Sequence, residues 1–190
     1  MEVEPLSLPD ARLIKPVRHG DHRGFFSETF RDSVLHEAGV RLPWVQDNHA
    51  RSPLPGTLRG LHFQVGASAQ AKLLRVSRGA ILDVIVDLRH GSPAFGQHLA
   101  IPISEDNWQQ IYVPVGFAHA YCTLCADTEV QYKVSAYYDP GSEQGLAWDD
   151  PDLGINWPFP ASDIIVSQRD TQHPRLRDLP KHFQYLKETS

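Results

Sequence analysis

Short hydrophobic runs alternate along the chain with glycine and proline, which recur at short intervals over its whole length. The runs are rich in Val, Ile, Leu, Phe and Tyr, and they cover Lys72–Val76, Ala80–Leu88, Gln110–Val113, Ala118–Leu124 and Glu129–Tyr138. Many short strands separated by turn residues are typical of an antiparallel sandwich or barrel, so we expect an all-β fold. Only Asp32–Ala38, which is followed by Gly39, reads as a short helix, with Asp or Ser as its cap.

Two of these runs indicate which residues share a face of a strand. In Ala80–Leu88 the even positions are all apolar, whereas Asp83 and Asp87 alternate with isoleucines on the other face. We therefore expect one face in the core and the other facing water or a polar cavity. In the last run, Tyr132 and Tyr138 share a face with small residues, which suits either a ligand cleft or a core.

No internal repeat or linker interrupts this pattern, so we expect one domain over residues 1–190. No apolar stretch approaches the roughly 20 residues of a membrane span, and the acidic N-terminus lacks the apolar core of a signal peptide. These features predict a cytoplasmic protein without a membrane partner. The net charge is −5 and the basic residues are scattered, which argues against a nucleic-acid partner but is compatible with a phosphorylated ligand.

Two motifs contain residue types that bind metals. The pair Cys122 and Cys125 lies in an apolar run with no second pair, so we expect two buried, reduced thiols. The segment ending at His119, PVGFAH, has the P-x-G-x-x-H shape of the second cupin motif, which supports a barrel. In metal-binding cupins this His joins an H-x-H pair, but here Gln64 follows His62 where the second His would stand. Two histidines alone make a poor metal site, so we expect no metal ion.

An ordered series of short motifs runs from Asp21 to Asp170. It comprises DHRGFFSETF (21–30), QDN (46–48), LRGLHFQ (58–64), KLLRV (72–76), DVIVDLRHGSP (83–93), GFAH (116–119), YK (132–133), YY (137–138), WDDP (148–151) and SQRD (167–170). In this order and spacing the set resembles the dTDP-4-dehydrorhamnose 3,5-epimerase family. The resemblance implies an all-β, cupin-type jelly-roll β-barrel with a few short helices and no cofactor. It also implies a homodimer, because N-terminal strands often complete a neighbouring subunit in that family.

The implied reaction inverts carbons 3 and 5 of dTDP-4-keto-6-deoxyglucose through an enolate and gives dTDP-4-keto-L-rhamnose. The C4 ketone acidifies the hydrogens on both carbons, so the enzyme needs a base, an acid, and a group that stabilises the enolate oxygen. By resemblance, His62 is the base, oriented by Asp170, and Tyr132 is the acid on the opposite side. Lys72, assisted by His119, corresponds to the group that stabilises the enolate oxygen.

The resemblance also assigns residues that bind the nucleotide. Arginine matches phosphate geometry with two parallel hydrogen bonds, which suits a diphosphate. The implied binding residues are Arg23, Arg59 and Arg169 for the diphosphate, Tyr138 stacked on thymine, Glu28, Gln46, Asn48 and Glu143 as further contacts, and Phe26 as a cover.

Three features depart from the simplest form of this interpretation. Arg59 and His62 are three residues apart, so a regular strand would face them oppositely unless Gly60 permits a bulge. Ala120 stands where family members commonly have glycine, and Arg169 replaces a lysine.

Seven histidines match no motif and are expected to be exposed: His19, His22, His36, His90, His98, His173 and His182.

Each candidate residue taken singly has a commoner structural explanation. A lone histidine is more often a buried residue with a partner, and a lysine at a strand start is usually a solvated charge. The ordered set favours the catalytic interpretation. The alternatives are a mono-epimerase at carbon 3 or 5, a ketoisomerase, a metal-dependent cupin and a non-catalytic sugar-binding cupin.

Overall fold

The computed structural model describes residues 1–186, which form strands, one short α-helix and four 3-10 helices. The first half contains β1 (Glu2–Pro5), β2 (Arg12–Lys15), β3 (Arg18–Asp21), β4 (Gly24–Ser27), α1 (Asp32–Glu37), β5 (Gln46–Ser52), β6 (Leu58–Gln64), η1 (Gly66–Ser68), β7 (Lys72–Arg78), β8 (Ala80–Asp87) and β9 (Arg89–His90). The second half contains β10 (His98–Ser104), β11 (Gln110–Val113), β12 (Phe117–Thr123), β13 (Thr128–Val134), β14 (Glu143–Gly145), η2 (Ala161–Asp163), η3 (Asp170–Gln172), η4 (Leu176–Asp178) and β15 (Phe183–Gln184).

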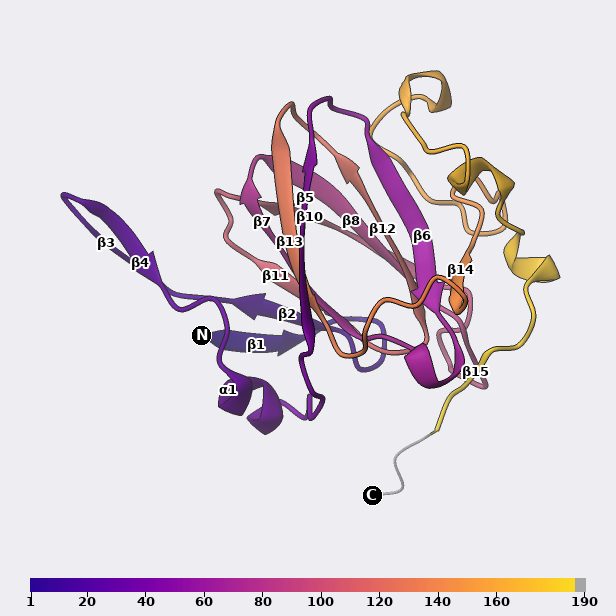
Figure 1. The fold of residues 1–190 in the computed structure, drawn as a ribbon, viewed down its shortest axis with the longest axis horizontal. Coiled ribbons are helices and arrows are strands. Elements are labelled where there is room, and N and C mark those ends of the chain that lie inside the picture. The colour runs from indigo at the N-terminus through magenta and orange to yellow at the C-terminus, as the bar shows by residue number, and fades with distance from the viewer. Residues whose placement is uncertain (187–190) are drawn as a thin grey trace.

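Two antiparallel sheets face each other and form the barrel (Figure 1). One sheet has six strands in the order β1-β2-β11-β7-β13-β5, and the other has five in the order β10-β8-β12-β6-β14. Neighbours in each sheet are far apart in sequence, as in β12 beside both β6 and β8, which is typical of a jelly roll. The expected all-β barrel is therefore confirmed.

The core lies between the two sheets at one end of the barrel. It includes Leu74 and Val76 from the six-stranded sheet and Ile81, Ile85 and Phe117 from the five-stranded sheet. Buried apolar area of this kind contributes about 25 cal/mol per Å² to folding, so this closed end stabilises the barrel. Polar side chains line the other end of the barrel.

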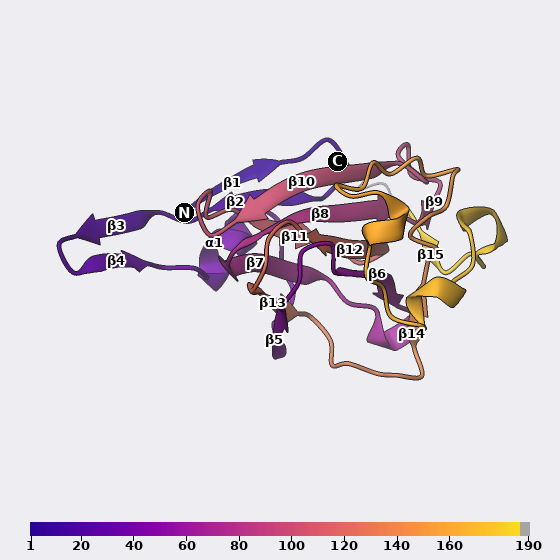
Figure 2. The ribbon, with the colours of Figure 1, turned by 90° about the horizontal axis from the view of Figure 1, so that it is seen from above.

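A long C-terminal segment covers the outer face of the five-stranded sheet (Figures 1 and 2). Leu153, Trp157, Leu179 and their neighbours pack against Val84 and Val86 of β8. The segment is also tied by hydrogen bonds, such as Leu58 N to Ile165 O at 2.9 Å. Consequently β8 is buried on both faces: the even face lies under this cover, and Ile81 and Ile85 lie in the barrel core. The prediction that only the even face is core was therefore wrong in part.

Helix α1 packs on the outer face of the six-stranded sheet, where Leu35 joins Leu73 and Tyr112 in a third apolar cluster. Just before it, the hairpin β3–β4 projects away from the barrel (Figure 2). At its base the Arg18 guanidinium lies 4.1 Å from the centroid of Trp108 and 4.7 Å from that of Phe25. This cation–π stack fixes the direction in which the hairpin extends.

The predicted strand runs correspond to β7, β8, β11, β12 and β13, and the predicted helix to α1. Most boundaries agree to within two residues, and two other differences matter more. Strand β13 ends at Val134 because the chain then turns away, so Tyr138 lies in a loop. Helix α1 has no side-chain cap, and its N-cap residue is Arg31. Both cysteines are free thiols; Cys122 is buried as predicted, and Cys125 is half-buried. Within residues 1–186, no helix has the length and hydropathy that a membrane span requires.

Candidate active site

A bulge in β6 places Arg59 and His62 on the same face. Opposite them on β12, His119 pairs with His62 and Tyr121 pairs with Arg59, so two residues between these pairs on β6 lie opposite one residue on β12. Gly60 sits in this extra step with φ +125°, and a Cβ at Gly60 would lie 2.5 Å from the carbonyl oxygen of His119. Only glycine fits this close approach. The predicted bulge at Gly60 is thus present, and it directs both side chains into one cavity.

The open end of the barrel holds a cavity of about 440 Å³. Its polar lining contains Arg59, His62, Lys72, His119, Tyr121, Tyr132 and Asp170. A second hollow of about 310 Å³ adjoins it and contains Gln46, Asn48, Tyr138 and Glu143. His62, Lys72 and Tyr132 line both, so the two hollows meet around these three side chains. The combined space is in the range that ordinarily holds a small-molecule ligand.

His62 and Asp170 form a hydrogen-bonded dyad. His62 Nε2 lies 2.7 Å from Asp170 Oδ1, and Asp170 is only 4% exposed on η3. Burial alone would raise the pKa of Asp170, but the hydrogen bond and charge of His62 and the Gly60 amide outweigh it and lower the pKa. Asp170 is therefore an ionised carboxylate that holds Nε2 of His62. The other ring nitrogen, Nδ1, is left as the basic atom.

Lys72 brings a half-buried ammonium group to the same place. Its Nζ lies 3.4 Å from the carbonyl oxygen of His62. Burial lowers the pKa of Lys72 to about 8, against the opposing effects of Glu143 and Asp83. A weakly solvated cation of this kind interacts strongly with negative charge that develops beside it.

Tyr132 enters the cavity from the opposite sheet. It lies on β13, between β7 and β5, whereas His62 lies on β6 of the other sheet. Burial raises the pKa of Tyr132 above its usual value, although the charge of Arg59 opposes this. Tyr132 is consequently a protonated hydroxyl at neutral pH, able to donate a proton. Both open explanations for this tyrosine face hold for Tyr132, which lines the cavity and also packs against the barrel core.

His119 is held by a buried carboxylate to which the sequence assigned no role. Its Nε2 lies 2.8 Å from Oδ2 of Asp83, which is completely buried. Among residues 1–186, the other oxygen of Asp83 has no hydrogen-bond partner. The sequence signal that could have revealed this role was the position of Asp83 between Ile81 and Ile85, on a strand face that is otherwise core.

Comparison with known proteins decides the family. The family model described as dTDP-4-dehydrorhamnose 3,5-epimerase matches residues 5–178. The chain belongs to this family. The family's enzyme from Sinorhizobium fredii is 46% identical over 187 residues, which are 98% of this chain and 95% of that protein.

Two solved structures extend the comparison. The Legionella pneumophila dTDP-6-deoxy-D-glucose-3,5-epimerase, in complex with dTDP-4-keto-L-rhamnose, is 36% identical with a TM-score of 0.93, and the match covers 98% of this chain and 99% of that one. ChmJ, a 3'-monoepimerase from Streptomyces bikiniensis in complex with dTDP-quinovose, is 39% identical with a TM-score of 0.84, covering 91% and 87%. The cupin-type jelly roll and the isomerase class of this epimerase follow from these relationships.

The mouth of the epimerase cavity is a connected polar network. Tyr138 donates from its hydroxyl to Glu143 at 2.7 Å, and Arg169 forms an ion pair with the same carboxylate. Gln46 donates to Asn48 at 2.8 Å and accepts from the Tyr138 amide at 3.0 Å. The structure therefore brings together five residues for which the sequence predicted nucleotide contacts.

The side chain of Gln64 makes hydrogen bonds that stabilise the fold of the epimerase. Its amide group donates to the carbonyls of Ser68 and Tyr137 and accepts from the amide of Asp139. It thus holds the loop that carries Tyr138, and it does not act as a second cupin ligand. His62, Asp170 and His173 do place possible ligand atoms within 4.8 Å of one another. The 2.7 Å contact in this group is a hydrogen bond, shorter than the roughly 3.3 Å that separates ligands around tetrahedral zinc.

Three predicted binding residues lie outside the cavity of their own chain. Arg23 and Phe26 are on the projecting hairpin, and Glu28 follows it (Figure 2). Arg23 pairs with Asp21 at 2.6 Å, Glu28 pairs with Arg31, and Phe26 is 73% exposed. The chain therefore does not bring these three residues to its own cavity.

The prediction that the seven unassigned histidines are exposed was wrong for four of them. The side chain of His173 is only 11% exposed because it packs beside the dyad. His182 is half-buried against Phe63 and Phe183, where the C-terminal segment returns to the sheet. His19, His22 and His36 are exposed as predicted, and His90 and His98 are half-buried.

The partly desolvated charge of Lys72 predicts a gain in stability when it is removed. Lys72→Met should raise the free energy of unfolding at pH 7 by about 1–2 kcal/mol, because a desolvated ammonium gives way to an apolar side chain. The pKa of Lys72 is about 8 in the folded state and near 10.5 in the unfolded chain, so wild-type stability rises across this window. The difference between the two proteins should therefore shrink from pH 8 to pH 10 in denaturant titrations.

Lys133→Met is the matched control, since Lys133 pairs with Asp47 on the protein surface. It should give no comparable gain. A Lys72→Met variant that is less stable than wild type at every pH would show that the ammonium is well solvated in the folded protein.

Proposed function

We propose that this epimerase inverts carbons 3 and 5 of dTDP-4-keto-6-deoxyglucose to give dTDP-4-keto-L-rhamnose. The observation that carries the proposal is the convergence on one cavity of a His–Asp dyad from one side and a half-buried tyrosine from the opposite sheet. A half-buried lysine with a lowered pKa completes the group. An epimerase needs two proton-transfer groups on opposite faces of the sugar, and this arrangement supplies them.

In the first step, a base removes a proton from the sugar. With Nε2 held by Asp170, His62 accepts the proton from carbon 3 or 5 at Nδ1. The ionised Asp170 then stabilises the imidazolium that forms. Lys72 donates to the oxygen on carbon 4 as the enolate develops, and His119 assists from its fixed position on Asp83.

The second step returns a proton to the opposite face. Tyr132 donates it, and the raised pKa of its hydroxyl keeps it in the protonated form beforehand. The tyrosinate that forms is stabilised by the nearby charge of Arg59, which acts on Tyr132 in the resting state as well. The product differs from the substrate only in the configuration of the carbon.

Nucleotide binding accounts for the residues at the mouth. Arg59 and Arg169 would bind the diphosphate, and Tyr138 would stack on thymine, beside Gln46, Asn48 and Glu143. Arg23, Phe26 and Glu28 would act in the site of a second subunit, reached by the projecting hairpin of a homodimer. Support comes from the exposure of these residues and from the fixed base of the hairpin. The cytoplasmic location stays a prediction from the sequence.

A subunit-mixing experiment tests the role of the hairpin. Arg23→Ala and His62→Ala proteins should each be nearly inactive alone. After re-equilibration, an equal mixture should recover about a quarter of wild-type activity, because half of the dimers are mixed and each has one complete site. An equal mixture of Arg59→Ala and His62→Ala should recover nothing, since both residues belong to the cavity of one chain. Recovery only in the control mixture, or in neither, would place Arg23 outside the partner's site.

A mono-epimerase is the second candidate, favoured by the similarity to ChmJ. Exchange of the protons on carbons 3 and 5 with solvent distinguishes the mono-epimerase from the double epimerase. Chelator-treated protein is mixed with dTDP-4-keto-6-deoxyglucose in heavy water and followed by NMR. Deuterium at carbons 3 and 5 identifies the double epimerase, and label at one carbon identifies the mono-epimerase. No label at either carbon overturns the acid–base proposal and leaves a sugar-binding protein.

A further inference from the structure

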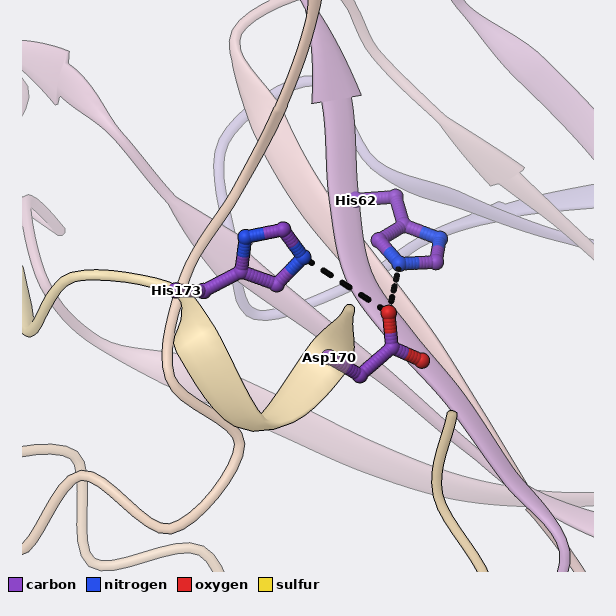
Figure 3. A group of neighbouring side chains, drawn as sticks. All are labelled: His62, Asp170 and His173. Atoms are coloured by element: carbon purple, nitrogen blue, oxygen red, sulfur yellow. Dashed lines mark hydrogen bonds and ion pairs between the residues drawn. The ribbon is translucent and has the colours of Figure 1, made fainter. Parts of the chain in front are cut away.

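A second histidine faces the catalytic carboxylate. His173 directly follows η3, and its Nε2 points at Oδ1 of Asp170 from 3.6 Å (Figure 3). The same oxygen receives Nε2 of His62 at 2.7 Å. The two imidazole rings meet edge to face, with centroids 5.7 Å apart and planes at 80°. Nε2 of His173 is buried and has no closer hydrogen-bond partner within residues 1–186.

The position of His173 is fixed by its surroundings. Its ring lies against Gly145 of β14, where an added Cβ would come within 2.3 Å of ring atoms. Gly145 in turn pairs with His62 in the sheet. The next residue, Pro174, accepts a hydrogen bond at 2.8 Å from the amide of Ala147. The absence of a side chain at position 145 thus lets the imidazole reach the dyad from the outer side of β6.

We propose that His173 is a positioning residue of the dyad: its Nε2–H is directed at Asp170 Oδ1 and limits how firmly that oxygen holds the protonated form of His62. The inference rests on the proposed role of His62 as the base. Movement of a few tenths of an ångström would bring the 3.6 Å contact into hydrogen-bond range. Asp170 would then share one oxygen between two donors, which weakens its attraction for the proton on His62.

The charges around His173 support a neutral donor. Burial lowers the pKa of His173, and positive charge on His62 lowers it further, while Asp170 raises it and Arg169 lowers it. The facing groups on β14 and β6 are Glu143, which is bound to Arg169, and His62, whose carbonyl oxygen contacts Lys72. A neutral imidazole with the proton on Nε2 fits this setting, since that nitrogen faces an ionised carboxylate.

Removal of the donor at position 173 should shift the pH dependence of the reaction in a defined direction. In His173→Phe the ring shape remains, but Asp170 interacts with His62 alone, so the imidazolium form of His62 becomes more favourable. The acidic limb of the pH profile of kcat/KM should move to higher pH by about half a unit to one unit. His173→Gln, which restores an N–H donor, should return the limb toward wild type. Gly145→Ala should mimic His173→Phe, because its Cβ displaces the ring without changing it.

An NMR titration of His62 in the free protein provides a readout that does not need turnover. Its midpoint should move to higher pH in His173→Phe and Gly145→Ala and return in His173→Gln. An unmoved midpoint in His173→Phe, with or without lost activity, overturns the proposal and leaves His173 a packing residue. If the midpoint moves while none of the proteins exchanges substrate protons, the contact with the dyad stands and the epimerase mechanism fails.

Discussion

Conversion of His62 to alanine should lower the rate of epimerisation by about 10³-fold or more and stop deuterium uptake at both carbons. The imidazole combines a free basic nitrogen with a carboxylate that stabilises its protonated form, and it enters the cavity from the sheet opposite Tyr132. Tyr132 and Lys72 cannot replace it at neutral pH, because the pKa of Tyr132 is raised and Lys72 carries a charge. Heavy-water NMR with the dTDP-4-keto sugar measures both carbons in one experiment.

His36→Ala is the matched control, since His36 also pairs with an aspartate but lies exposed on α1. It should leave the rate unchanged. The His62→Ala protein should still bind dTDP, because the nucleotide contacts lie at the mouth of the cavity. Uptake of deuterium at carbon 3 or carbon 5 by this variant would mean that another base serves that carbon.

The second large effect concerns Tyr132. Tyr132→Phe should keep the exchange of protons with solvent but lose correctly inverted product by about 10²-fold, because His62 can remove a proton and return it to the same face. Uncoupling of exchange from inversion is therefore the expected signature, read by comparing deuterium content with the configuration of the recovered sugar. Binding should change little, because the ring remains and only the hydroxyl is removed.

Tyr137→Phe is the control, because Tyr137 is also a tyrosine of this region but is 70% exposed. Normal inversion by Tyr132→Phe would eliminate Tyr132 as the acid. Loss of exchange together with inversion would assign it a part in removing the proton.

The sequence predicted the sheets well because period-two alternation and glycine–proline punctuation are local signals. The bulge at Gly60 was also predictable, since Arg59 and His62 could share a cavity only if the strand gained a residue between them. Resemblance identified the dyad partner of His62, because no local pattern connects positions 62 and 170. The structure then brings these two side chains to 2.7 Å.

What the sequence missed depends on contacts between distant segments. Asp83 gained a role only when β12 placed His119 beside it, and His173 only when the C-terminal segment folded over β14. The end of β13 at Val134 is likewise set by the hydrogen bonds of Gln64 to the Tyr138 loop. Hydrophobic periodicity carries no information on such partners.

The C-terminal cover has a consequence for how the catalyst is assembled. His62, Tyr132 and Lys72 belong to the barrel, but Asp170 arrives on a segment that is mostly loop and short 3-10 turns. Segments of this kind open at a lower free-energy cost than the strands beneath them. When this C-terminal segment detaches, Asp170 moves away from His62 while both sheets stay intact. The enzyme should therefore lose activity at a lower temperature than the one at which the barrel unfolds.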